Sequence, residues 1–119
     1  MKRHRALFAL FLLIPVSACH SYRIDATVTN HTGAAIGLLE VDYPSASFGA
    51  DALAANADFH YRFQVRENGP IKVQYSELAN HAVRHATGPL LYEKQQGHVE
   101  IDLLPRGTVE FHTELSPHS

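Results

Sequence analysis

Apolar residues recur at every second position in segment after segment of this 119-residue chain, and this period restricts its fold more than any other feature. Successive side chains of a β-strand point to opposite faces, so the spacing gathers the apolar set on one face of a sheet. No stretch of the body sustains helical spacing for long. We therefore predict an all-β body, and because roughly one hundred residues build one core, a single domain.

The first two predicted strands cover residues 22–29 and 36–43, and Pro44 ends the second. Residues 44–58 then form a long stretch rich in small residues. We predict an irregular crossover between sheets here, with about one helical turn. Because alanine favours helix, a helix near residues 51–57 is the alternative.

The next two segments with clear alternation are residues 59–65 and 71–75, which we expect to pair as a β-hairpin. A three-residue loop at 67–69 keeps the inward residues of both strands opposite one another. It pairs Val65 with Ile71, whereas a two-residue turn would break the pleat.

Residues 82–87 and 90–94 alternate less regularly, and we expect one or two shorter strands around Gly88 and Pro89. The total of about seven short strands is typical of a single antiparallel β-sandwich, similar to the immunoglobulin-like or transthyretin-like type. The chain lacks the cysteine pair and the tryptophan of a true immunoglobulin domain. An open barrel is the alternative.

The last two predicted strands form a second hairpin around the loop 105–107, with apolar residues of 99–103 facing those of 109–113. The same register sets six polar residues in pairs on the outer face: His98 opposite Glu114, Glu100 opposite His112, and Asp102 opposite Glu110.

The N-terminal residues differ in kind from the body. Residues 1–5 are basic, residues 6–16 are apolar, and small residues lead to Cys19, the one cysteine of the chain. About eleven apolar residues span roughly 17 Å as a helix, well short of a hydrocarbon core of about 30 Å. We therefore predict a helical export signal rather than a membrane span.

The tetrapeptide Val16-Ser17-Ala18-Cys19 resembles the lipobox of bacterial lipoproteins at all four positions. The resemblance implies cleavage between Ala18 and Cys19, and a lipid on the Cys19 thiol, which would hold the chain on a membrane. The predicted organisation is a signal peptide at 1–18, a lipid-anchored N-terminus at 19–21, a β-sandwich domain at 22–116 and a tail at 117–119.

The residue after the cysteine is His20. Enterobacterial lipoproteins retained at the inner membrane carry aspartate there, so histidine favours the periplasmic face of the outer membrane in a Gram-negative host. In a host with one membrane, the same anchor would hold the protein outside the cell. We thus predict a lipid-anchored protein of the cell envelope.

Composition narrows the function further. Beyond the predicted signal, the chain carries seven basic and twelve acidic side chains, which argues against binding nucleic acid. No pattern indicates a cofactor. No serine lies in a Gly-x-Ser-x-Gly turn, and Cys19 is assigned to the lipid, so no enzyme is predicted.

The outer face of the last hairpin is the best candidate metal site. Its predicted ligands are His98, His112, Glu100 and Glu114. Pairing of histidines with carboxylates of opposite charge explains the same face without any metal.

A second candidate site is a contact loop at residues 42–49, where aromatic and small polar side chains combine. Its residues are Tyr43, Ser45, Ser47 and Phe48. The alternative is that Tyr43 and Phe48 pack beneath the crossover.

Together these features predict an envelope lipoprotein whose β-sandwich is a binding or structural module for another envelope protein, a peptide or a glycan. Two alternatives stand beside it. One is a periplasmic metal-binding lipoprotein that uses the outer-face histidines, and the other is an accessory or inhibitor of an envelope enzyme.

Overall fold

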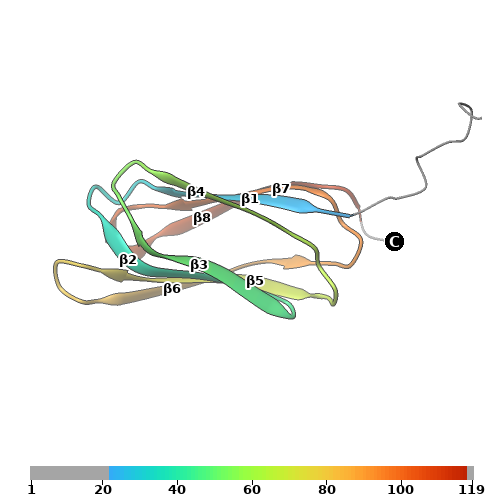
Figure 1. Cartoon of the computed structure of the whole chain (residues 1–119), viewed down its shortest axis with the longest axis horizontal. Coiled ribbons are helices and arrows are strands. Elements are labelled where there is room, and N and C mark those ends of the chain that lie inside the picture. The colour runs from blue at the N-terminus through green and yellow to red at the C-terminus, as the bar shows by residue number, and fades with distance from the viewer. Residues whose placement is uncertain (1–21, 118–119) are drawn as a thin grey trace, which may run out of the picture.

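The computed structural model describes residues 22–117, which form two β-sheets packed face to face (Figure 1). The strands are β1 (Ile24–Asn30), β2 (Ile36–Tyr43), β3 (Ala46–Leu53), β4 (Asp58–Phe63), β5 (Gly69–Glu77), β6 (Val83–Leu91), β7 (Gly97–Leu103) and β8 (Val109–Leu115), with a 3₁₀ turn, η2 (Pro105–Gly107), before the last. The β-sandwich is confirmed, with eight strands in place of about seven. The predicted signal helix lies outside the described residues.

Sheet I has the strand order β4-β1-β7-β8, and sheet II has the order β3-β2-β5-β6. The chain crosses from β1 to sheet II for β2 and β3, returns for β4, crosses again for β5 and β6, and ends in sheet I with β7 and β8. One neighbouring pair, β1 with β7, is parallel. The prediction of a purely antiparallel sandwich is wrong at this pair, because no hairpin joins the two strands to fix their relative direction.

The first two strands agree closely with the prediction. In β1, Ile24, Ala26 and Val28 are buried, and β2 begins and ends where expected, although β1 starts after Tyr22. Within β2 the backbone has a bulge at Leu38, whose φ of 48° is positive. The bulge reverses the alternation, so Leu38 is exposed while its neighbours along the strand are buried.

The predicted crossover at residues 44–58 is wrong, and so is the alternative helix. Pro44 and Ser45 form a two-residue turn, and β3 folds back on β2 along its whole length. The phase change of β2 is matched in β3, where the buried Phe48 and Leu53 are five residues apart. A strict period of two therefore does not reveal this strand.

The predicted hairpin of residues 59–65 with 71–75 is also wrong. β4 lies in sheet I beside β1, while β5 lies in sheet II between β2 and β6. The link between them carries Val65 into the core, and Val65 does not pair with Ile71. The inward residues of β5 were predicted correctly, but alternation identifies a strand's buried face and not its neighbour.

Of the one or two strands predicted around Gly88 and Pro89, the structure has one, β6, which runs through both residues. Pro89 is tolerated because it lies on an edge strand at a bulge, where the register between β6 and β5 shifts and Pro89 is not one of the paired residues. Gly88 faces Phe111 of β8 across the open side of the sandwich, so closely that a Cβ atom would lie 2.7 Å from the Phe111 ring.

The C-terminal hairpin of β7 and β8 has the predicted register, with Ile101 opposite Phe111. Its loop ends in Gly107, which has a positive φ of 75°. All three predicted outer-face pairs are confirmed. This hairpin was predictable because a short loop joins its strands directly, so the loop length fixes the register.

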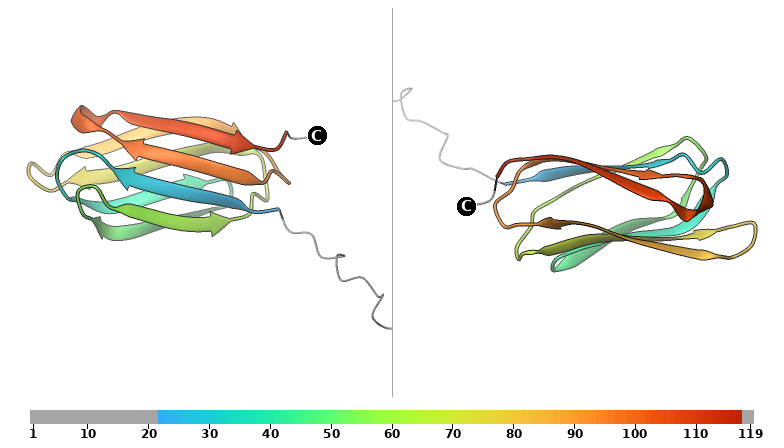
Figure 2. Two further views of the ribbon diagram at one scale, coloured as in Figure 1. Left: turned by 90° about the horizontal axis from the view of Figure 1, so that it is seen from above. Right: turned by 180° about the vertical axis from the view of Figure 1, so that it is seen from behind.

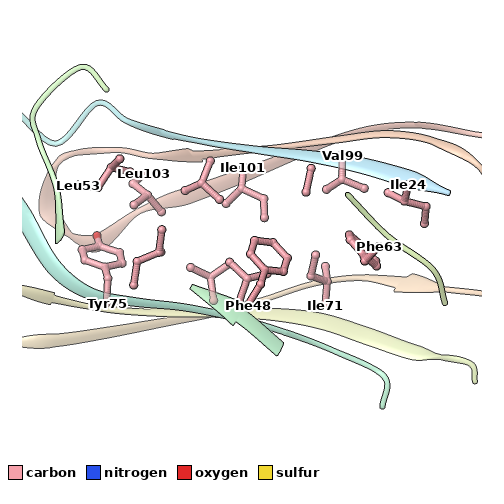
Figure 3. Close-up of a cluster of buried hydrophobic side chains, with 14 of the residues drawn as sticks. Ile24, Phe48, Leu53, Phe63, Ile71, Tyr75, Val99, Ile101 and Leu103 are labelled. Atoms are coloured by element: carbon pink, nitrogen blue, oxygen red, sulfur yellow. The ribbon is translucent and has the colours of Figure 1, made fainter. Parts of the chain in front are cut away.

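Between the sheets lies one hydrophobic core (Figure 3). Ile24 and Val99 lie toward one end of it, and Tyr75 lies toward the other near Leu103. The open side between β3 and β4 is closed by stacked aromatic rings, with Phe48 and Tyr61 at a centroid distance of 4.4 Å. The sandwich is thus sealed along that side by aromatic packing rather than by strand pairing.

Both chain ends of the described segment lie at the same end of the sandwich (Figure 2). β1 begins beside the start of β7, and β7 begins beside the end of β8. Within residues 22–117, no helix has the length and apolar character needed to cross a membrane.

Candidate functional site

The outer face of sheet I carries a regular array of polar side chains, which we call the polar grid. It arises because the outward positions of four neighbouring strands lie in register. Its three rows, starting nearest residue 22, are Arg62–Asp25–His98–Glu114, His60–Thr27–Glu100–His112 and Asp58–Thr29–Asp102–Glu110. The grid thus holds six carboxylates, three histidines and one arginine.

On the β4–β1 half of the grid, a hydrogen bond joins the β4 side chain to the β1 side chain in each row. Arg62 Nε donates to Asp25 Oδ1 at 2.7 Å, and Thr29 Oγ1 donates to Asp58 Oδ1 at 2.9 Å. The bond from Arg62 lowers the pKa of Asp25 and raises the pKa of the guanidinium in turn. This half is internally paired.

The β7–β8 half is more open. A shallow hollow of about 360 Å³ is lined by His98, Glu100, Asp102, His112 and Glu114. All four predicted metal ligands, His98, Glu100, His112 and Glu114, therefore line one hollow. Their ligand atoms do not converge on one point as a set.

A tighter cluster lies at one end of this half. Nε2 of His112 is 3.5 Å from Oε1 of Glu110 and 3.8 Å from Oδ2 of Asp102. The ligand atoms of these three residues lie within 4.8 Å of one another. Of the predicted metal ligands, His112 alone belongs to this cluster.

His31 approaches the same cluster from another part of the chain. Its Nδ1 atom is 3.9 Å from Oδ1 of Asp102. His31 follows β1 directly, and its N–H donates to the carbonyl of Leu103 at 2.8 Å. His31 could not be predicted from the sequence, because the parallel pairing of β1 with β7, which brings these strand ends together, leaves no local signal.

Asn30 holds the backbone around His31 in place. Its side chain is fully buried, and Nδ2 donates to the carbonyl oxygens of Ala34 and Leu53 at 2.9 and 3.0 Å. Its Oδ1 accepts from both N and Oγ1 of Thr32. The turn that presents His31 is thereby fixed on both sides of the histidine.

The predicted contact loop is replaced by the tight turn between β2 and β3. Phe48 is only 7% exposed, and the Tyr43 ring stacks on Phe63 at a centroid distance of 4.2 Å. Burial raises the pKa of Tyr43. Ser45 and Ser47 are exposed, but the aromatic rings belong to the packing of the sandwich. Ala18 and Cys19, the predicted cleavage and lipidation residues, lie outside the described part of the chain.

Comparison with known proteins adds information on the fold. No protein-family model matches the chain, and no curated protein sequence matches it. A solved structure described as "NMR structure of the protein from Eubacterium rectale" is similar, with a TM-score of 0.55 and 12% sequence identity. The match covers 82% of this chain and 92% of that one. At this identity the likeness supports the β-sandwich and leaves the activity open.

Proposed function

We propose that the chain is a lipid-anchored lipoprotein of the bacterial envelope, in which the β-sandwich is a binding module and the polar grid is its contact surface for a basic partner. In a Gram-negative host its place would be the periplasmic face of the outer membrane. The Val16-Ser17-Ala18-Cys19 motif supports the anchor. The grid supports the contact surface.

One observation carries the choice of the grid. Six carboxylates lie in register on one sheet face, with Arg62 as the single arginine or lysine among them. Such an excess of one sign attracts groups of the other sign and speeds their association. A basic segment of an envelope protein or peptide would be attracted to these carboxylates, whereas a neutral glycan carries no positive charge to pair with them.

The anchor can be tested independently of the partner. In Cys19→Ala cells the protein should leave the membrane fraction, because no thiol remains to carry the lipid. Ser21→Ala, a small change just outside the motif, should leave the distribution unaltered. Retention of the Cys19→Ala protein on salt-washed membranes would show that the lipobox assignment is mistaken.

The contact surface needs a different experiment. We expect crosslinking in native envelopes to join the protein to a partner with a basic segment, and the yield to fall with added salt. The double change Glu100→Gln with Glu114→Gln should reduce this yield strongly. The matched control is Glu40→Gln with Glu93→Gln, which removes two exposed carboxylates outside the grid. Equal yields from both variants would count against the grid.

A further inference from the structure

We propose a zinc site at the end of the polar grid farthest from residue 22, with the ligands Asp102, Glu110, His112 and His31. The site does not depend on the lipid anchor or on a protein partner. Its ligand set shares only His112 with the set predicted from the sequence.

The distances within the cluster suit one ion. Ligand atoms held about 2.1 Å from a tetrahedral Zn²⁺ ion lie roughly 3.4 Å apart. The separations of His112 from Glu110 and Asp102 are 3.5 and 3.8 Å, within a few tenths of an ångström of this value. All three ligand atoms lie within 4.8 Å of one another, so the two carboxylates would have to approach each other by at most about 1.4 Å. The side chains can adjust by small torsional changes, because all three reach solvent.

His31 supplies the fourth ligand by a side-chain rotation. Its ring is half exposed, and its Nδ1 atom lies 3.9 Å from Oδ1 of Asp102, whereas His112 approaches Oδ2 of the same carboxylate. Its backbone is fixed by the bond from its N–H to Leu103. The backbone position of the imidazole is thus defined, and zinc binding requires the half-exposed ring to turn toward the three clustered ligand atoms.

The charges at this point favour a cation independently of the distances. Asp102 and Glu110 face each other directly across β7 and β8, and like charges so placed repel. Among residues 22–117, the ion-pair partners of these two carboxylates are His31 and His112 alone, with no lysine or arginine. A divalent ion would remove the repulsion and use the same histidines as neutral ligands.

The mixture of donors selects the metal. Two imidazoles with two carboxylates form a set that Zn²⁺ accepts in tetrahedral geometry. Ca²⁺ prefers six to eight oxygen ligands, and Mg²⁺ prefers an octahedron of oxygens that includes several waters. We therefore expect zinc to bind in the presence of either ion, and Cu²⁺ to compete with it.

The experiment is calorimetric titration of ZnCl₂ into the processed, detergent-solubilised chain, purified without a histidine tag. We expect one ion per chain, with binding unaffected by an excess of Ca²⁺ or Mg²⁺. Asp102→Asn, His112→Ala and His31→Ala should each weaken the affinity at least about tenfold. His98→Ala is the matched control, since His98 lines the same hollow but lies outside the cluster.

Three results would overturn the proposal. They are the absence of zinc uptake, an unchanged affinity in His31→Ala, and a loss in His98→Ala as large as that in His112→Ala. NMR of the chain without substitutions tests the site with no risk that a variant unfolds. Zinc should shift the imidazole signals of His31 and His112 and leave that of His85 on β6 in place.

Discussion

At the scale of single residues, Asn30 shows how one buried polar side chain can organise a turn. It begins a glycosylation sequon, Asn30-His31-Thr32, yet its side chain is fully buried and every polar atom of its amide has a partner. A glycan could not be attached without unfolding this end of the sandwich. The residue serves the fold, and its neighbour His31 is the one presented to solvent.

Replacing Asn30 should therefore be costly. Asn30→Ala removes the donor to the buried carbonyl of Leu53 and the acceptor for Thr32, which should lower the free energy of unfolding by about 2 to 4 kcal/mol. Asn30→Asp should cost more, because a carboxylate accepts hydrogen bonds only and would face those same carbonyl oxygens. Urea unfolding measures both. Asn68→Asp, at an exposed acceptor, should change stability by less than about 0.5 kcal/mol.

The ion pair of Glu77 with Arg84 gives a dependence on pH. Arg84 Nε donates to Glu77 Oε2 at 2.9 Å, and this bond, followed by one from Asn80, lowers the pKa of Glu77 from its usual 4.5. A carboxyl with a lowered pKa adds stability above its unfolded pKa and loses it as the pH falls through the folded value.

Chemical unfolding of the wild type and Glu77→Gln should reveal this contribution. The wild type should be the more stable at pH 7, and its advantage should shrink steadily once the pH falls below about 4.5. Glu67→Gln serves as the control, since Glu67 has no ion pair in the described structure. An advantage that stays constant down to pH 3 would show that the carboxylate is not what stabilises the fold.

At the scale of strands, alternation predicted which faces are buried but left the neighbours undetermined. The bounds of β2 and the register of β7 with β8 follow from the sequence, since both depend on local signals. β3 was missed because the bulge at Leu38 and the matching phase change in β3 break the period. The predicted pairing of residues 59–65 with 71–75 was wrong because the alternation of apolar and polar residues in each segment fits a strand of either sheet. It does not show that the two segments lie in different sheets.

The candidate site divides in the same way. The β7–β8 half of the polar grid was predictable, because a short loop sets its register. The β4–β1 half and His31 were not, because they reach the site through the parallel pairing of β1 with β7 and through crossings between the sheets. Contacts between distant segments depend on the whole core rather than on any local pattern.

The contact of Gly88 with Phe111 supports a prediction about the edge strands. A Cβ atom at position 88 would lie 2.7 Å from the Phe111 ring and 2.8 Å from Ile71, so Gly88→Ala should cost about 1 to 3 kcal/mol by overpacking. In the background of Phe111→Ala the same change should cost much less. A double-mutant cycle from thermal unfolding measures this coupling, and simple additivity would mean that the ring does not limit the space.

At the scale of the whole molecule, both sheets contribute to one hydrophobic cluster. The outer face of sheet I is the polar grid, and outward positions of sheet II carry polar residues such as Glu40, Lys72 and Gln74. A sheet separated from its partner would expose its entire buried surface to water. We infer that the sandwich is one cooperative unit.

This cooperativity predicts coincident unfolding transitions. Near-ultraviolet dichroism of the tyrosines reports on packing, since Tyr75 lies within the core and Tyr43 stacks on Phe63, while far-ultraviolet dichroism reports on the strands. Both signals should change at the same urea concentration and with the same slope. Loss of the tyrosine signal ahead of the strand signal would show that the core loosens before the sheets separate.

The parallel pair of β1 and β7 has a mechanical consequence. β1 is hydrogen-bonded along its length to β4 on one side and to β7 on the other. It is the first strand of the described chain, so the N-terminal segment leads directly into it (Figure 2). A pull on the N-terminus would act along the strand, so both ladders would have to shear together instead of opening one bond at a time. The tension borne by any tether at that end would thus fall on an inner strand of sheet I, which is held by a neighbour on each side.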